Sequence, residues 1–297
     1  MLYNTPQYSP TFIREKHIPE IFEINRLNDC YVKYLLGSES HKDLTIQFLN
    51  DILNREGSQS IIDLSFSNKE FSPHVPEGKL NTLDIRCKIN DGSQVHVEIQ
   101  VRRKPFIIER FLYYWAMIYA DQLKQGDEYH YLKPVISINL LNFNQLSEEN
   151  WHNIYQLRNT KTHTALTNHC EIHYLELKKF TFRNLLHLKR AEKWALYFSG
   201  NRGNEWRELT MNDKTMNKVQ RAEMEFTKDE DLRWQYILQE RALHDYNTDI
   251  KYAKTEAINK IVLKMLKTNS PYEYISEITD YPIERIKAIA KEHHLTD

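Results

Sequence analysis

Glycine and cysteine are both scarce in this sequence, which has 7 glycines and 3 cysteines among 297 residues. Glycine-rich loops that hold nucleotide phosphates need several glycines close together, so the sequence disfavours the enzyme classes built on them. Cys30, Cys87 and Cys170 lie far apart and form no Cys-x-x-Cys pair. This spacing favours reduced thiols over disulfide bonds or a structural zinc site.

Long apolar runs are also missing, because none approaches the ~20 residues that a helix needs to cross a bilayer. The first twenty or so residues are polar and interrupted by proline, so we expect no targeting segment, no membrane association and a cytoplasmic location. Neither sign of charge dominates, since 40 Lys+Arg face 41 Asp+Glu, for a net charge of −1. Any binding to DNA must therefore use a local basic patch rather than an overall field.

Residues 82–101 predict a β-hairpin, because apolar and polar residues alternate on both sides of residues 90–92. Alternation with a period of two is typical of strands buried on one face. A three-residue Asn-Asp-Gly loop, with its glycine in the left-handed conformation, pairs Cys87 with Val95 and Ile85 with Val97. A two-residue loop would shift this register by one residue and turn every side chain to the other face.

The same register sets Asp84 opposite Glu98, with Cβ atoms about 5 Å apart and Gln100 as a diagonal neighbour at roughly 7–8 Å. Two like charges at that distance repel by about 3 kcal/mol at an effective dielectric of ~20, so the pair calls for a cation. Carboxylate oxygens at this spacing suit Mg²⁺ or Mn²⁺. The alternative is that Glu98 pairs diagonally with Arg86 on a solvated face, which is worth only about 0.2–1 kcal/mol and implies no function.

The spacing of Asp84 and Glu98-Ile99-Gln100 resembles the motif of the PD-(D/E)XK nuclease superfamily, in which an acid on one strand precedes acid-x-Lys on the next. Further segments extend the resemblance over about residues 25–180. These segments are Asn28-Asp29-Cys30-Tyr31-Val32-Lys33, Glu109-Arg110, Tyr113, Gln122-Leu123 and Gly126-Asp127-Glu128-Tyr129. Together they resemble the Rpn family of that superfamily, the recombination-promoting nucleases or transposase-like proteins.

This resemblance implies a Mg²⁺- or Mn²⁺-dependent endonuclease that hydrolyses phosphodiester bonds of DNA in recombination or in mobile elements. It implies that Asp84, Glu98 and the backbone carbonyl of Ile99 hold the ion, while the residue at position 100 orients or activates the attacking water. Gln100 stands where the superfamily has lysine. An amide is no general base and carries no charge, although it can position water by hydrogen bonds. Since Rpn-like proteins commonly have glutamine there, activation of the water would fall to the metal.

Several other residues near the motif are candidates with a plainer alternative. The basic residues Arg102, Arg103, Lys104 and Arg110 are predicted to meet DNA phosphates, and a solvated turn of mixed charge is the alternative. Asp29 and Lys33 are predicted by the resemblance to support the site, whereas their spacing also suits a surface ion pair one helical turn apart. His96 is predicted to be a surface histidine.

The remaining periodicity predicts an α/β fold with a mixed sheet. Helices are expected over residues 28–36, 40–54 and 107–123, and strands over 61–66, 135–140 and 171–177. With the hairpin, this order is the αβββαβ core that the resemblance implies. We expect an irregular arm over residues 1–24, a nuclease-like domain over 25–180 and an all-helical region over 181–297.

The helical region has an apolar stripe at Ile258, Ile261, Val262, Met265 and Leu266 that needs a partner, within the chain or across a homodimer. Residues 270–291 resemble a small helix-turn-helix tail. Over residues 270–297 six acids face three Lys+Arg, so we expect packing or oligomerisation rather than DNA reading from this tail. Two other functions remain open: an inactive nuclease-derived DNA-binding or regulatory protein, which the glutamine at position 100 favours, and a helical interaction scaffold.

Overall fold

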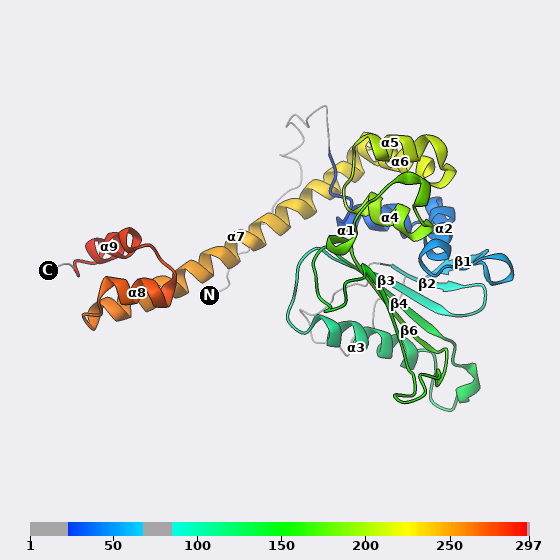
Figure 1. Cartoon of the computed structure of the whole chain (residues 1–297), viewed down its shortest axis with the longest axis horizontal. Helices are drawn as coiled ribbons and strands as arrows, with labels where there is room; N and C mark the ends of the chain where they lie inside the picture. Colours follow the sequence, from blue (N-terminus) through cyan, green and yellow to red (C-terminus); the bar gives the residue numbers. More distant parts are fainter. Residues whose placement is uncertain (1–22, 68–84, 296–297) are drawn as a thin grey trace, which may run out of the picture. The chain divides into compact units, whose positions relative to one another are not determined.

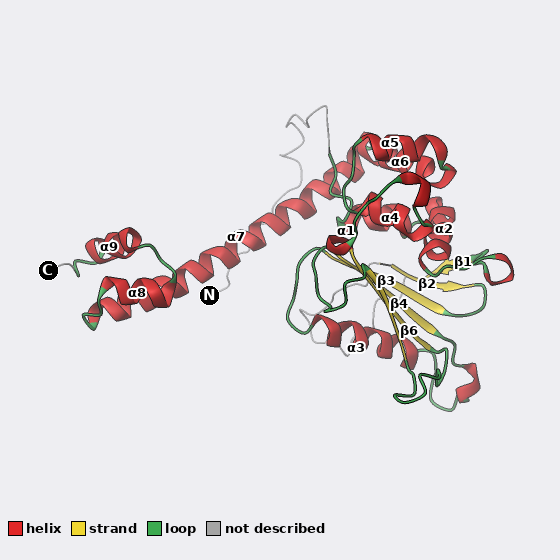
Figure 2. Ribbon diagram, viewed as in Figure 1, coloured by secondary structure: helices red, strands yellow, loops and turns green. Residues whose placement is uncertain are grey.

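A mixed six-stranded sheet with helices on both faces forms the centre of the first part of the chain (Figures 1 and 2). The computed structural model describes residues 23–67 and 85–295. The chain divides into two compact units after Arg233. No helix in the described ranges is both long and apolar enough to cross a membrane.

The sheet has the strand order β1-β2-β3-β4-β6-β5, in which β3, β4 and β6 are parallel and the other neighbours are antiparallel. Its strands are β1 (Leu64–Phe66), β2 (Ile85–Ile89), β3 (Gln94–Gln100), β4 (Val135–Leu141), β5 (His152–Gln156) and β6 (Cys170–Glu176). All predicted strands are present. The edge strand β5 was not predicted, because its two apolar residues, Ile154 and Tyr155, are exposed and leave no buried alternation.

The hairpin of β2 and β3 has the predicted register, with Cys87 opposite Val95 and Ile85 opposite Val97. Gly92 has φ of 90° and donates its N–H to the carbonyl of Ile89 at 2.9 Å, which closes the three-residue loop. Asp84 precedes β2 and lies outside the described residues. Its pairing with Glu98 therefore stays a prediction.

Helices α1 (Asp29–Leu36), α2 (Lys42–Ile52) and α4 (Arg190–Phe198) lie on one face of the sheet, and α3 (Ile107–Ala120) lies on the other (Figure 1). On α3, Ile107 and Phe111 pack against apolar residues of β4 and β6. The predicted helices are thus confirmed, although α3 ends at Ala120 rather than near residue 123. The order from α2 to β4 is αβββαβ, the order that the resemblance implies, and α1 precedes it.

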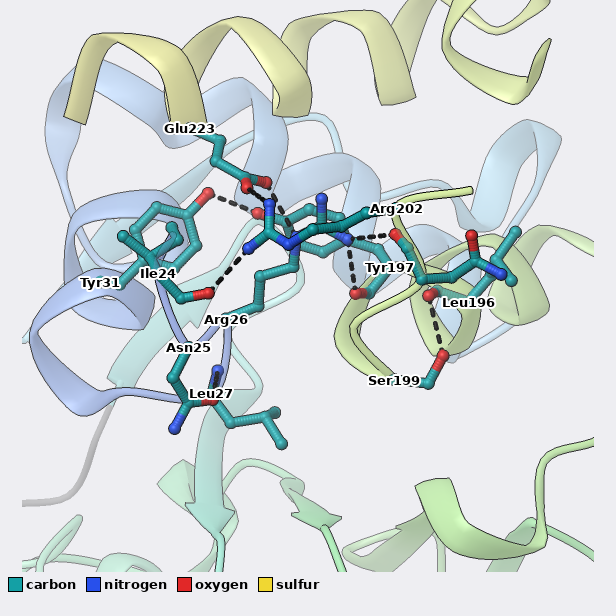
Figure 3. A network of polar contacts seen from close by, with 11 residues as sticks. Ile24, Asn25, Arg26, Leu27, Tyr31, Leu196, Tyr197, Ser199, Arg202 and Glu223 are labelled. Atoms are coloured by element: carbon teal, nitrogen blue, oxygen red, sulfur yellow. Dashed lines mark hydrogen bonds and ion pairs between the residues drawn. The ribbon is translucent and has the colours of Figure 1, made fainter. Parts of the chain in front are cut away.

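Helices α5 (Asn204–Asn212) and α6 (Lys214–Lys228) also belong to the first unit; α6 packs on α1 and α2, and α5 packs on α6. A polar cluster around Arg26 connects this helical layer to the segment before α1 (Figure 3). Arg26 donates to Glu223 on α6 at 2.9 Å and to the carbonyls of Tyr197 and Asn201 at 3.1 and 2.8 Å. Its guanidinium also lies 4.2 Å from the ring centre of Tyr197 and 4.9 Å from that of Trp206.

The boundary between the two compact units falls after Arg233, and the predicted domain boundary near residue 180 stays a prediction. The helices after residue 180 belong to the same compact unit as the sheet, because α4 packs on α2 and α6 packs on α1 and α2. The change from strand to helix patterning near Lys179 therefore marks a change of layer within one unit.

The second unit consists mainly of α7 (Glu230–Lys267), α8 (Tyr272–Thr279) and α9 (Ile283–Glu292). Val262 and Leu266 are buried together with Ile275, Ile286 and Ile289. Part of the predicted apolar stripe on α7 thus finds its partner in the helices that follow it. Ile261, from the same stripe, is 49% exposed.

Candidate active site

Glu98 is a buried carboxylate on the central strand β3, with a relative exposure of 2%. Residues alternate between the faces of the strand, so its face is shared by His96 and Gln100. The parallel register sets Asn139 of β4 beside it. The sheet thus places an acid in its interior, where an uncompensated negative charge would be costly.

Two donors reach the same oxygen of Glu98. The Gln100 amide donates to Oε1 at 3.2 Å, and Nη2 of Arg110, from the first turn of α3, lies 3.4 Å from that oxygen. The amide contributes a hydrogen bond without charge, whereas the guanidinium contributes the positive charge. Arg110, predicted to meet DNA phosphates, is therefore directed at the carboxylate of Glu98.

Arg86, the alternative partner of Glu98, makes an ion pair with Asp121 just after α3, at 3.4 Å. Glu98 makes an ion pair with Arg110, whose Nη2 lies 3.4 Å from its Oε1. One arginine balances one carboxylate, so Glu98 by itself does not require a metal ion. The case for an ion rests on a second carboxylate nearby, and Asp84 is the residue that the sequence proposes for it.

His96 is fully buried at 0% exposure, so the prediction of a surface histidine is wrong. It lies in the interior of the sheet opposite Arg86, between strands β2 and β4. Burial, and then the nearby charge of Arg86, lower the pKa of the imidazole to about 3. Its ring is therefore neutral at physiological pH, and neither ring nitrogen has a hydrogen-bond partner in the described part of the chain.

Ser137 and Asn139 extend the polar face onto β4, and neither was predicted from the sequence. Asn139 donates to the Ser137 hydroxyl and to the carbonyl of His173, each at 3.1 Å. Both side chains are fully buried, and they lie in register with His96 and Glu98. The signal was present, because a buried parallel strand is usually an unbroken apolar run and this one carries two polar residues at alternate positions.

The predicted residues Ile99 and 102–104 lie at the end of β3 or just after it. Ile99 is buried and its side chain points to the face opposite Glu98, which leaves only its backbone for a role at the site. Arg102 and Lys104 are exposed just after β3. Arg103 is exposed too and donates to the Gln145 side chain at 3.2 Å.

Asp29 and Lys33 belong to α1, on the face of the sheet away from α3 (Figure 2). The helix begins there because the Asn28 side chain accepts hydrogen bonds from the N–H groups of Cys30 and Tyr31. The structure thus assigns this segment a helix-starting role. The predicted support of the site by Asp29 and Lys33 stays a prediction.

The oxygen atoms near Glu98 are of the type that binds a hard divalent cation. The buried Glu98 carboxylate, the Gln100 amide oxygen and the backbone carbonyl of Ile99 are the oxygen ligands that Mg²⁺ and Mn²⁺ prefer. Within residues 23–67 and 85–295, no group of three or more His, Cys, Asp or Glu side chains is placed to hold a metal. These residues therefore fit such an ion only together with another carboxylate.

One comparison with known proteins identifies a family. A family model described as PD-(D/E)XK nuclease family transposase matches residues 26–253. No curated protein and no solved structure matches the chain. The matched range runs from the segment before α1 into α7, so it includes the helices α4 to α6 as well as the whole sheet.

Proposed function

Because the chain belongs to the PD-(D/E)XK nuclease family of transposases, we propose that it is a metal-dependent endonuclease that hydrolyses phosphodiester bonds of DNA. The nuclease class follows from the family. The observation that supports a working site is the buried Glu98 on the central strand, with Gln100 and Arg110 both directed at it. An association with recombination or mobile elements is part of the proposal.

In this proposal Asp84, Glu98 and the backbone carbonyl of Ile99 hold Mg²⁺ or Mn²⁺. Such an ion, when bound, lowers the pKa of a bound water and polarises a phosphoryl oxygen. Gln100 uses one N–H on Glu98, so its second N–H and its carbonyl oxygen remain to position the attacking water. Arg110 keeps the Glu98 carboxylate oriented and supplies the positive charge that glutamine lacks at position 100.

The exposed basic residues after β3 are proposed to contact the DNA. Arg102 and Lys104 follow the strand end that carries Gln100, and in this proposal they contact phosphates flanking the bond that is cut. Such contacts contribute affinity without sequence preference. The cytoplasmic location stays a prediction.

Metal removal tests this function directly. We expect the purified full-length protein to nick supercoiled plasmid in Mg²⁺ or Mn²⁺, and we expect EDTA to stop the reaction because no described side chain replaces the ion as activator of water. The measured quantity is the rate of conversion to open-circular DNA. Plasmid binding without nicking in either metal would instead support the inactive DNA-binding alternative.

For the helical region we propose a second copy of the chain as partner, bound along α7. Residues 241–254 of this 38-residue helix are almost all exposed. Leu243, Tyr246 and Ile250 follow the 3-4 spacing of a coiled-coil seam and are 38%, 61% and 50% exposed. In a parallel pair, Asp249 of one copy and Lys254 of the other occupy flanking positions of opposite charge, which favours a second copy as the occupant.

Self-association is measured by light scattering after size exclusion. We expect the wild-type particle to have twice the 35.7 kDa mass of one chain. We expect the Ile250→Lys particle to have the mass of one chain, because dimerisation would have to remove water from the buried lysine charge. Tyr252→Lys is the matched control, since Tyr252 is 68% exposed outside the seam. A wild-type monomer, or equal effects of both substitutions, contradicts this proposal.

A further inference from the structure

A basic cavity opens at the first residue of β3, on the face of the sheet that also carries Glu98. Its volume is about 500 Å³, and its lining includes Arg86 and Lys88 of β2, Gln94 of β3, Asp121 and Lys133. Arg86 and Lys88 alternate with apolar residues along β2, and they share the face of Gln94 because Lys88 is paired with Gln94 and Arg86 with His96. We call this cavity the β2–β3 basic pocket.

Among the described residues that line the β2–β3 basic pocket, positive charge exceeds negative charge. Arg86 and Asp121 pair with each other at 3.4 Å, which leaves the charges of Lys88 and Lys133. Both lysines are exposed, and neither ammonium group has an ion pair with any residue in the described ranges. Two like charges at one cavity favour an anion as the occupant.

The pocket wall is held in place by other contacts. The Gln122 amide donates to the Lys133 carbonyl at 3.0 Å and accepts from the Lys133 N–H at 2.9 Å. Gly92 packs beside the Lys133 side chain, where an added Cβ would lie 3.4 Å from its Cδ. The backbone of Lys133 is therefore held by Gln122, and the aliphatic part of its side chain lies against Gly92.

We propose that the β2–β3 basic pocket binds a backbone phosphate of the nucleic acid whose bond is cut at Glu98. Gln94 and Glu98 are four residues apart on one strand, which corresponds to about 13 Å. The inference rests on the proposed function, because it takes the substrate to be DNA.

The test measures DNA binding in EDTA, so that its result does not depend on cleavage. The double variant Lys88→Ala/Lys133→Ala is compared with wild type by fluorescence anisotropy of a labelled duplex over a range of salt concentrations. We expect roughly tenfold weaker binding and a log-log salt slope that is smaller by about 0.9 for each phosphate that the variant no longer neutralises. Lys161→Ala/Lys178→Ala removes the same charge from exposed positions elsewhere and serves as the matched control.

Three outcomes would overturn the proposal. The first is an unchanged DNA affinity and salt slope in the pocket variant, and the second is an equal loss of DNA affinity in the control variant. The third is that millimolar inorganic phosphate or ATP displaces the wild type from DNA and does not displace the pocket variant. The last would assign the pocket to a free phosphate compound. Plasmid nicking by the wild type is measured separately and tests the proposed nuclease function. If the pocket variant binds DNA weakly and the wild type does not nick plasmid, the nuclease function is refuted and the pocket proposal stands.

Discussion

Glu98→Gln is expected to lower the rate of metal-dependent plasmid nicking by about 10³-fold or more. The substitution keeps the size of the side chain and its hydrogen bond with Gln100, while it removes the charge that an ion needs. A factor of 10³ corresponds to about 4 kcal/mol of transition-state stabilisation, which is within the range for a group that fixes a catalytic metal.

Two controls separate chemistry from folding in that experiment. Glu208→Gln changes an exposed carboxylate on α5 and should leave nicking unchanged. The Glu98→Gln protein should bind DNA in EDTA as wild type does, because its defect lies in the metal. Nicking at an undiminished rate by Glu98→Gln would show that the activity does not come from this site.

Arg26→Met is expected to reduce the free energy of unfolding of the first unit by about 3–5 kcal/mol, the range for removing one partner of a buried ion pair. Arg26 and Glu223 have side-chain exposures of 2% and 10%. Methionine would remove the Arg26 donor from the Asn201 carbonyl, leave the Tyr197 carbonyl with backbone N–H donors such as Gly200, and leave Glu223 with Arg202 alone. Urea unfolding followed by tryptophan fluorescence measures the loss.

The control for this prediction is Arg207→Met, an exposed arginine on α5 for which we expect a change within about 0.5 kcal/mol. Arg26→Lys should fall between the two, because lysine keeps the charge without the planar fork that stacks on Tyr197 and Trp206. An Arg26→Met protein as stable as Arg207→Met would mean that the cluster in Figure 3 does not hold the helical layer to the segment before α1.

The hairpin was predictable from sequence because its information is local. Alternation identifies the buried face, and the glycine of a three-residue loop sets the register, so Cys87 and Val95 pair as expected. Arg26 carried no such signal. Its partners lie 171 and 197 residues away, and nothing in the sequence near Arg26 indicates which distant groups will surround it.

The candidate site was predictable only in part. Glu98 and Gln100 follow from strand spacing, whereas the approach of Arg110 depends on how α3 crosses the sheet, which periodicity does not determine. His96 was misjudged for the same reason, since its burial comes from neighbouring layers rather than from its own strand. The polar residues of β4 are a local signal that a search for alternation inside apolar runs would find.

The central claim is that Glu98 holds a divalent ion together with a second carboxylate. Anomalous diffraction from crystals of the full chain soaked in Mn²⁺ tests it most directly, because the ion is located without reference to activity. The proposal predicts one strong peak within about 2.0–2.3 Å of a Glu98 oxygen and of an Asp84 oxygen. A map in which the Glu98 carboxylate contacts Arg110 and no manganese, with the ion absent or bound elsewhere, would contradict it.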